Sequence, residues 1–231
     1  MTAKTASLSG GYVRIDCGGS WECYTLGGDV SFGGDQGWFG NEDGYIRPLG
    51  CGLISCADIL LYRTGRRELV RDEYTGYVRS LEKDRLKVRK KLGLNGLSMA
   101  RGMNRQFRAL GLGLKAGWGF SKKKIMPRIL EMLGQDIPVT LSVGPHILFK
   151  KKDRPTGVNF YIRTEEGFVL PHWRSGLVKD HYVTVTAVVE TPDRTMLEIS
   201  SWGERYYIDW AEYEAYINTP GTFFSNVLYI K

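Results

Sequence analysis

The sequence predicts an α+β domain in which helices come first and an antiparallel sheet follows. Apolar residues recur at helical spacing between Leu53 and Tyr62. From Ile137 onward the period changes to two and β-branched residues become frequent. Helices followed by strands favour an antiparallel sheet with the helices packed to one side. The 231 residues contain no repeat and no linker, so we expect one domain over residues 1–231.

Glycine dominates the first part of the chain. Gly18-Gly19 and Gly27-Gly28 divide short strand-like runs, and paired glycines suit tight hairpin turns. We expect a Gly-rich β-meander over residues 1–32, either part of the domain or an extension of it, and then an irregular loop to Gly50. The predicted strands of the meander are residues 12–17, 21–26 and 30–32.

Cysteine usage gives no sign of a disulfide or a metal. A two-residue turn at Gly18-Gly19 would place Cys17 and Cys23 on opposite faces of a hairpin, so no bridge between them is expected. No two cysteines have the spacing of a zinc site, and the chain has three histidines. We therefore expect no metal and no other cofactor.

Four helices are predicted in the middle of the chain. The segment from Leu53 to Tyr62 is expected to be a buried helix. Asp72 and Ser98 are expected to cap the second and third helices, the second running to about residue 91. Pro127 suits the first turn of the fourth, which ends near residue 134. The third helix is predicted to bury Met99, Met103, Phe107 and Leu110 and to carry Arg101, Arg105 and Arg108 on another face.

Strands follow in the second half of the chain. Alternating or β-branched runs predict six of them, with a helix capped by Asp209 and ending at Ile217 before the last. The predicted strands are residues 138–143, 158–163, 182–190, 196–200, 205–208 and 223–230.

Basic charge is concentrated between Lys83 and Arg128, where fourteen Lys or Arg residues stand against one acid, Asp84. Such a region is a candidate surface for an acidic partner or nucleic acid. The alternative is a solvated helical surface, because aromatic residues that could stack on bases are not interleaved through it. No apolar run reaches the roughly 18 residues of a membrane helix. Residues 1–9 lack a signal-peptide core, so we expect a cytoplasmic protein without a membrane partner, unless it is exported as an effector.

Cys51 is the candidate nucleophile. It lies between Gly50 and Gly52, directly before the first apolar helix. A helix N-terminus lowers the pKa of a thiol through its unpaired N–H groups and its dipole. Cys56, one turn further, lacks this setting and is predicted to be an ordinary buried thiol.

A cysteine nucleophile needs an imidazole base that is close in space but not in sequence. His181 begins a predicted strand, which would fix its ring, and it is the preferred base. His146, after a strand end, and His172, in a loop, are the weaker alternatives.

Several segments, in order, resemble the papain-like cysteine peptidases. The closest group is the bacterial peptidases similar to double-glycine leader-processing domains of bacteriocin exporters. Residues 50–60 resemble the nucleophile helix, and residues 180–185 resemble the histidine strand. Gln36 stands fifteen residues before Cys51, where that group carries glutamine. Residues 129–143 are similar to the helix and strand between nucleophile and base, and residues 200–203 to the papain motif Asn-Ser-Trp-Gly.

The resemblance implies a role for each matching residue. Cys51 attacks a carbonyl, and His181 takes its proton and returns it to the leaving amine. The Gln36 amide and the Cys51 N–H donate to the developing oxyanion. Ser200 stands where the family has the Asn or Asp that orients the imidazole, and its hydroxyl is shorter and uncharged. Ser201 and Asp180 are alternative partners for the ring.

The implied substrate is a peptide or protein, cleaved after small residues such as Gly-Gly. The chain itself carries Gly10-Gly11, which suggests self-processing after Gly11 as a hypothesis. Trp202 is expected either to stack over the histidine or to be a core aromatic.

Two other functions remain open at this point. The first is a weakly active or inert binding module that uses its basic helices. The second is a transamidase or amidase with the same catalytic residues.

Overall fold

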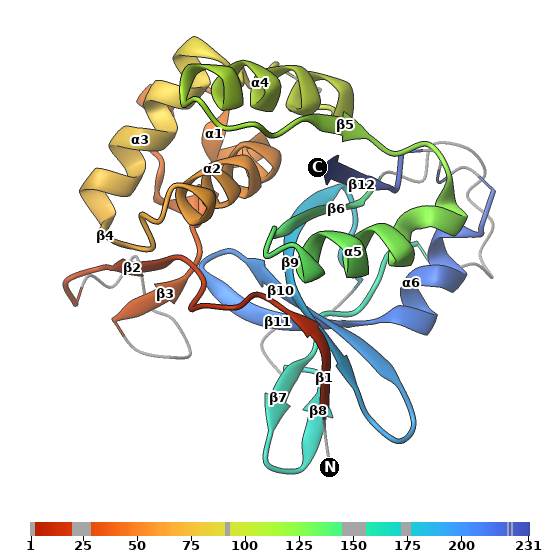
Figure 1. The fold of residues 1–231 in the computed structure, drawn as a ribbon. Coiled ribbons are helices and arrows are strands. Elements are labelled where there is room, and N and C mark those ends of the chain that lie inside the picture. Colours follow the sequence, from red (N-terminus) through yellow and green to blue (C-terminus); the bar gives the residue numbers. More distant parts are fainter. Residues whose placement is uncertain are drawn as a thin grey trace.

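The computed structural model describes residues 3–19, 29–90, 93–144, 156–171, 177–220, 222 and 224–231. Within these residues the chain forms six α-helices and a seven-stranded antiparallel sheet, beside two smaller sheets (Figure 1). The mixed α+β class predicted from the sequence is therefore confirmed. No helix in the described part of the chain is long and apolar enough to cross a lipid bilayer.

The large sheet is built around β9 (His181–Glu190), which pairs with β6 (Val139–Val143) and β10 (Thr195–Ser201). The strand order is β11-β10-β9-β6-β12-β5, and β1 pairs with β9 as well. All of these pairings are antiparallel. The remaining strands of this sheet are β1 (Ala3–Ser7), β5 (Ala116–Trp118), β11 (Glu204–Asp209) and β12 (Val227–Ile230).

The predictions for the sheet are confirmed at its centre and wrong at its margins. β6, β9, β10 and β11 lie within a residue or two of their predicted bounds, whereas β1 and β5 were not predicted. The expected strand 158–163 does not form as a unit. Val158 and Tyr161 make isolated bridges to Val178 and Tyr207, and only the end of the run enters β7 (Ile162–Thr164), which pairs with β8 (Gly167–Val169).

The N-terminal strands form a separate three-stranded sheet. β2 (Arg14–Asp16) lies between antiparallel β3 (Val30–Phe32) and parallel β4 (Glu68–Val70). The predicted strand 21–26 lies outside the described residues. Cys17 donates its N–H to the Asp29 carbonyl and is disulfide-bonded, so the expectation of an unbridged Cys17 is wrong. β2 has β3 on one edge and β4 on the other, whereas the expectation assumed a two-residue hairpin at Gly18-Gly19; Cys23 lies outside the described residues.

The helices agree with the predicted segments, but several caps do not. α2 (Cys51–Arg63) begins at the candidate nucleophile, and Asp209 caps α6 (Trp210–Ile217) as expected. Asn95, not Ser98, caps α4 (Gly96–Ala109), and Leu110 follows that helix as an exposed residue instead of lining its apolar face. α3 follows Val70 and ends well before residue 91. The other helices are α1 (Ile46–Leu49), α3 (Arg71–Asp84) and α5 (Ile125–Gly134).

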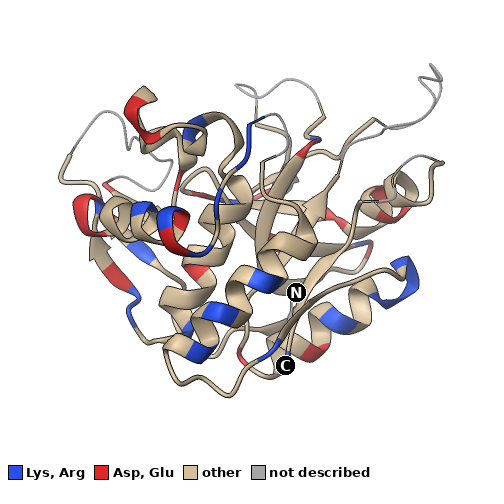
Figure 2. Cartoon of the chain, turned by 90° about the horizontal axis from the view of Figure 1, so that it is seen from above, with Lys and Arg blue, Asp and Glu red and all other residues tan. Residues whose placement is uncertain are grey.

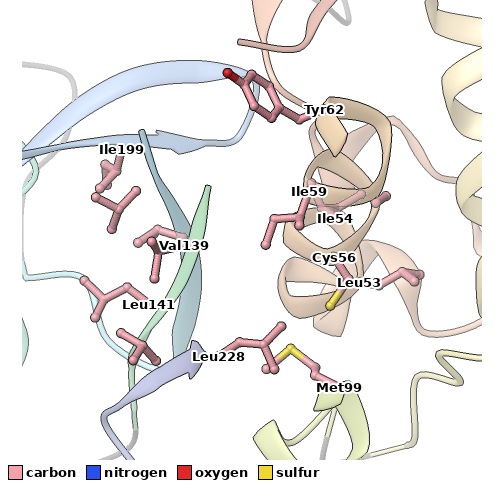
Figure 3. Packing of buried hydrophobic residues seen from close by; sticks show 14 of the residues in the cluster. Leu53, Ile54, Cys56, Ile59, Tyr62, Met99, Val139, Leu141, Ile199 and Leu228 are labelled. Atoms are coloured by element: carbon pink, nitrogen blue, oxygen red, sulfur yellow. The ribbon is translucent and has the colours of Figure 1, made fainter. Parts of the chain in front are cut away.

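α2 is the central helix of the core. Residues 52–62 are all buried, and the helix packs against β9 and β6 and contacts α3 and α4 (Figure 1). Ile59 of α2 points toward the apolar residues of β6 and β10, and Leu228 of β12 lies beside Met99 of α4 (Figure 3). One hydrophobic cluster therefore joins the helical part to the sheet.

Candidate functional site

Cys51 is the first residue of α2, with Gly50 at the N-cap position. The residue is half-buried, and its neighbour Gly52 is packed tightly. A Cβ on Gly52 would lie 3.0 Å from Met99 Sδ and 3.2 Å from a ring carbon of Tyr182. Gly52 thus lets α4 and β9 approach the start of α2, which fixes the position of Cys51.

His181, the first residue of β9, is 7% exposed. Its Nε2 is 2.7 Å from Ser201 Oγ, at the end of the neighbouring strand β10. The indole of Trp202 stacks on its ring, with centroids 4.1 Å apart and planes 9° apart. The imidazole is therefore held at its edge by Ser201 and on one face by Trp202.

Ser200 does not hold the imidazole, contrary to the role that the resemblance assigns to it. Its hydroxyl donates to the Phe32 carbonyl at 2.7 Å, and Ser201 makes the contact with His181 instead. Successive side chains of a strand point in opposite directions, so only one of the two serines can reach the ring. Of the two alternative partners, Ser201 and Asp180, Ser201 is the one whose hydroxyl lies at hydrogen-bond distance from the imidazole.

A tight turn places Trp202 over the histidine. Ser201 pairs with Glu204 across the β10–β11 hairpin, which leaves Trp202 and Gly203 as the two turn residues. Both have positive φ, 51° and 73°, as a two-residue hairpin with the twist of its strands requires. A left-handed tryptophan costs about 1 kcal/mol or more, which its stacking on His181 offsets. Sequence reasoning missed this strain, because glycine or asparagine is usual at such a position.

Gln36 begins the short 3₁₀ helix η2 (Gln36–Trp38), which Asp35 caps through the Gly37 N–H. Its Nε2 donates to the Arg47 carbonyl at 2.9 Å, and its Oε1 is buried without a hydrogen-bond partner. An amide nitrogen carries two N–H groups, so one donor of Gln36 is used by Arg47.

One narrow pocket brings the predicted residues together. Its free volume is about 10 Å³, roughly the room that one water molecule needs. It is lined, among others, by Gln36, Cys51, His181, Ser200, Ser201 and Trp202. The pocket thus joins residues from four separate parts of the chain. His146 and His172, the alternative bases, lie outside the described residues.

Burial and hydrogen bonding act in opposite directions on the pKa of Cys51. Burial raises the pKa of the Cys51 thiol, while the backbone N–H groups of Tyr182, Gly52 and Cys51 itself lower it by a smaller amount. The helix start alone therefore does not make a thiolate, contrary to the expectation from sequence. Burial also raises the pKa of Cys56 far above its usual range, as expected for a structural thiol.

Asp58 is the member of this site that sequence reasoning missed. Cys51, Ser55 and Asp58 follow at i, i+4 and i+7, so they share one face of α2, and all three line the pocket. The Asp58 carboxylate accepts hydrogen bonds from Tyr74 OH at 2.6 Å, Tyr12 OH at 3.1 Å and Gly34 N at 3.2 Å. An acidic residue inside an otherwise apolar helix is the signal that could have revealed it.

Ser55 joins the same face of α2 to the sheet. Its hydroxyl lies 2.7 Å from both Thr140 Oγ1 on β6 and Thr184 Oγ1 on β9. The floor of the pocket is therefore polar and fully hydrogen-bonded at this point, which fixes the helix relative to the strand of His181.

No metal-binding cluster of three or more His, Cys, Asp or Glu residues occurs in the described part of the chain. No family model matches the chain, and no curated protein or solved structure is significantly similar to it.

The buried Asp58 carboxyl predicts an unusual pH dependence of stability. Burial raises its pKa from 3.8 to about 6, so between these values the folded state binds a proton that the unfolded state does not. Stability from this group therefore rises as the pH falls from about 6 to 4, by about 3 kcal/mol. Urea unfolding of the wild type and Asp58→Asn across this range should show the wild type gaining on the variant as the pH falls.

Asp43 provides the control with the opposite sign. The side-chain hydrogen bond from Arg79 lowers the pKa of this carboxyl, so the stability that it contributes is lost as the pH falls through its folded pKa. The wild type should therefore lose its advantage over Asp43→Asn in acid. If the free energies of unfolding of the wild type and Asp58→Asn changed with pH by the same amount, the raised pKa of Asp58 would be contradicted.

Proposed function

We propose that this chain is a cysteine peptidase of the papain-like type, with Cys51 as nucleophile and His181 as base. The observation that carries the proposal is the shared pocket, in which Cys51 at a helix start meets a histidine whose Nε2 is held by Ser201. A nucleophile, a base and a group that orients the base form the arrangement that such catalysis needs. The positioning residue is Ser201, and Ser200 is not proposed for this role.

In the proposed reaction, the Cys51 thiol gives its proton to Nδ1 of His181, because Nε2 faces Ser201. The sulfur then attacks the carbonyl carbon of the scissile bond. The C–N bond breaks as His181 returns the proton to the leaving amine, and a thioester remains on Cys51. Water, deprotonated by the same imidazole, attacks the thioester, and the acid product leaves with the thiol restored. No cofactor enters these steps.

The oxyanion of each tetrahedral intermediate would receive two donors. One is the backbone N–H of Cys51, which has no partner within the helix at this first position. The other is the second N–H of Gln36 Nε2, the first being used by Arg47. The hydrogen bond to the Arg47 carbonyl holds this amide in one orientation. A donor of this kind is worth about 3 kcal/mol in comparable sites.

The narrow pocket favours a substrate with small residues at the scissile bond, such as Gly-Gly. The free space of about 10 Å³ leaves no room for a large side chain beside Cys51. A transamidase or amidase with this site would also prefer small residues, because it differs from the peptidase only in the acceptor of the acyl group.

The structure gives no support to processing of the chain's own Gly10-Gly11 within one molecule. Ser9 N donates to Asp136 Oδ1, and a Cβ on Gly10 would overlap the Arg67 guanidinium. Tyr62, near the end of α2, hydrogen-bonds the same Asp136. This segment therefore lies by the C-terminal end of α2, about 16 Å along the helix from Cys51.

An inert binding module is the second candidate, and the raised pKa of Cys51 is the observation that favours it. A thiol that burial keeps protonated, beside an imidazole oriented by an uncharged serine, would react slowly. The two candidates differ in whether any peptide is cleaved.

Incubation with a diverse library of synthetic peptides, read by mass spectrometry, tests the enzymatic proposal. The wild type should cleave peptides with Gly or another small residue before the scissile bond, and Cys51→Ala should lose at least about 10³-fold in rate. Cys56→Ala should retain activity, which separates the two thiols of α2. The absence of cleavage by the wild type, or equal cleavage by Cys51→Ala, would sink the proposal.

The two serines of β10 provide a sharper comparison. Ser201→Ala should lower kcat by about 10-fold or more, because a hydrogen bond to an imidazolium is worth about 1.5–3 kcal/mol. It should also shift the basic limb of the kcat/KM profile to lower pH, since the imidazolium that faces the Cys51 thiolate loses a partner. Ser200→Ala should change stability through the Phe32 carbonyl and leave the pH profile unchanged. Ser201→Thr, which keeps the hydroxyl, should restore the rate; a profile that Ser201→Ala does not shift would contradict the positioning role.

A further inference from the structure

One face of α4 carries a single row of exposed side chains. Leu97, Arg101, Arg105 and Arg108 follow at spacings of four, four and three residues, which places them along one side of the helix. Met99, Met103 and Phe107 are buried on the other side. We call the row from Leu97 to Arg108 the arginine track. It is about 16 Å long at the rise of an α-helix.

The track has no acidic counterpart. The sequence holds no Asp or Glu between Arg85 and Arg128. Within the described part of the chain, ion pairs involve Arg67, Arg79 and Arg194, and none involves an arginine of α4. Figure 2 shows blue along α4 without red, whereas α3 carries both colours. Three guanidinium groups are thus presented together to solvent.

The first turn of α4 packs against the start of α2, next to the candidate nucleophile. Met99, in the first turn of α4, and the Leu94 carbonyl are the groups that a Cβ on Gly52 would approach. Gly96, the first residue of the helix, lies against Trp118, whose ring meets Tyr182 edge-on with centroids 6.1 Å apart. Leu97 is 46% exposed at this end, and the three arginines lead away from it.

We infer that the arginine track binds an acidic stretch of the polypeptide substrate, a conclusion that rests on the proposed peptidase function. Guanidinium groups pair with carboxylates through two parallel hydrogen bonds, which favours arginine over lysine in such a role. An extended chain advances about 3.3 Å per residue, so a substrate lying along the track meets the arginines two to five residues beyond its contact with Leu97. Asp or Glu at those positions would increase affinity without entering the narrow pocket.

Two features favour an acidic polypeptide over nucleic acid. The first turn of α4 packs against Gly52, the residue after the candidate nucleophile. The exposed residues of α4 include no aromatic ring on which bases could stack. Backbone phosphates would still be attracted to the same arginines, so nucleic acid is a separate outcome of the test.

Binding by the Cys51→Ala protein tests the inference without turnover. The probe is a fluorescein-labelled peptide of Gly-Gly joined to six glutamates, and the same peptide with six glutamines is the neutral reference. The glutamate peptide should bind more tightly at about 50 mM salt and lose this advantage at about 300 mM, because exposed charges are screened. Reversal of Arg101, Arg105 and Arg108 to Glu should weaken its binding by about tenfold or more.

A matched variant with Arg14, Arg66 and Arg163 reversed to Glu controls for net charge, since these three are also exposed but lie on other elements. It should bind within about threefold of the parent. Equal losses in both triple variants, or no preference for the glutamate peptide, would overturn the inference. Tighter track-dependent binding of a DNA duplex would overturn it in favour of nucleic acid. Arg105→Glu alone, checked by thermal unfolding, keeps the test valid if the triple variant does not fold.

This experiment and the peptide library fail independently. Binding along the track without cleavage would contradict the peptidase and leave the surface as a binding site for acidic polypeptides. If the wild type cleaved peptides but the track variants bound the glutamate peptide as well as the parent, the peptidase function would be supported. The proposed binding of acidic residues by the arginine track would then be contradicted.

Discussion

The buried carboxylate of Asp58 is the constraint on which the arrangement of the site depends. A carboxylate inside a core is costly unless it is hydrogen-bonded, and each of its three donors comes from a different part of the chain. Tyr12 comes from the N-terminal segment, Tyr74 from α3, and the Gly34 N–H from the loop that leads to Gln36. Because Asp58 and Cys51 share one face of α2, the hydrogen bond from Gly34 to the carboxylate also brings the loop that carries Gln36 close to Cys51.

The same loop is connected to the histidine through the β10–β11 hairpin. Phe32 N donates to the Gly203 carbonyl, and Gly203 N donates to the Gly34 carbonyl. Gly33 has φ of 78°, and a Cβ there would overlap Ser200 Oγ. Only glycine therefore suits the point where this loop passes β10. The turn that lays Trp202 on His181 is therefore also the turn that positions the segment before Gln36. Cys51, His181 and Gln36, the three residues of the proposed site, are therefore connected through one set of backbone contacts.

The sequence predicted what local patterns determine. The apolar run of α2, the alternating strands at the sheet centre and the positions of Cys51 and His181 could all be read from spacing. It did not predict β1 and β5, whose short runs gain their order from β9 and β12. The exchange of roles between Ser200 and Ser201 depends on which way a strand residue points at a hairpin, and a motif does not specify that. The burial of Asp58 depends on three hydrogen-bond partners that are distant in sequence, so only the tertiary structure explains why a carboxylate is tolerated there.

The central claim is that His181 activates Cys51 despite a burial that by itself keeps the thiol protonated. The most direct measurement is the rate of Cys51 alkylation by iodoacetamide between pH 5 and 10, with Cys56 in the same digest as the buried reference. An ordinary thiol titrates near pH 8.5. The account predicts labelling of Cys51 at pH 6 at least about tenfold faster than such a thiol allows, lost in His181→Ala. A single titration at or above pH 8.5, unchanged in His181→Ala, would contradict it and favour an inert binding module.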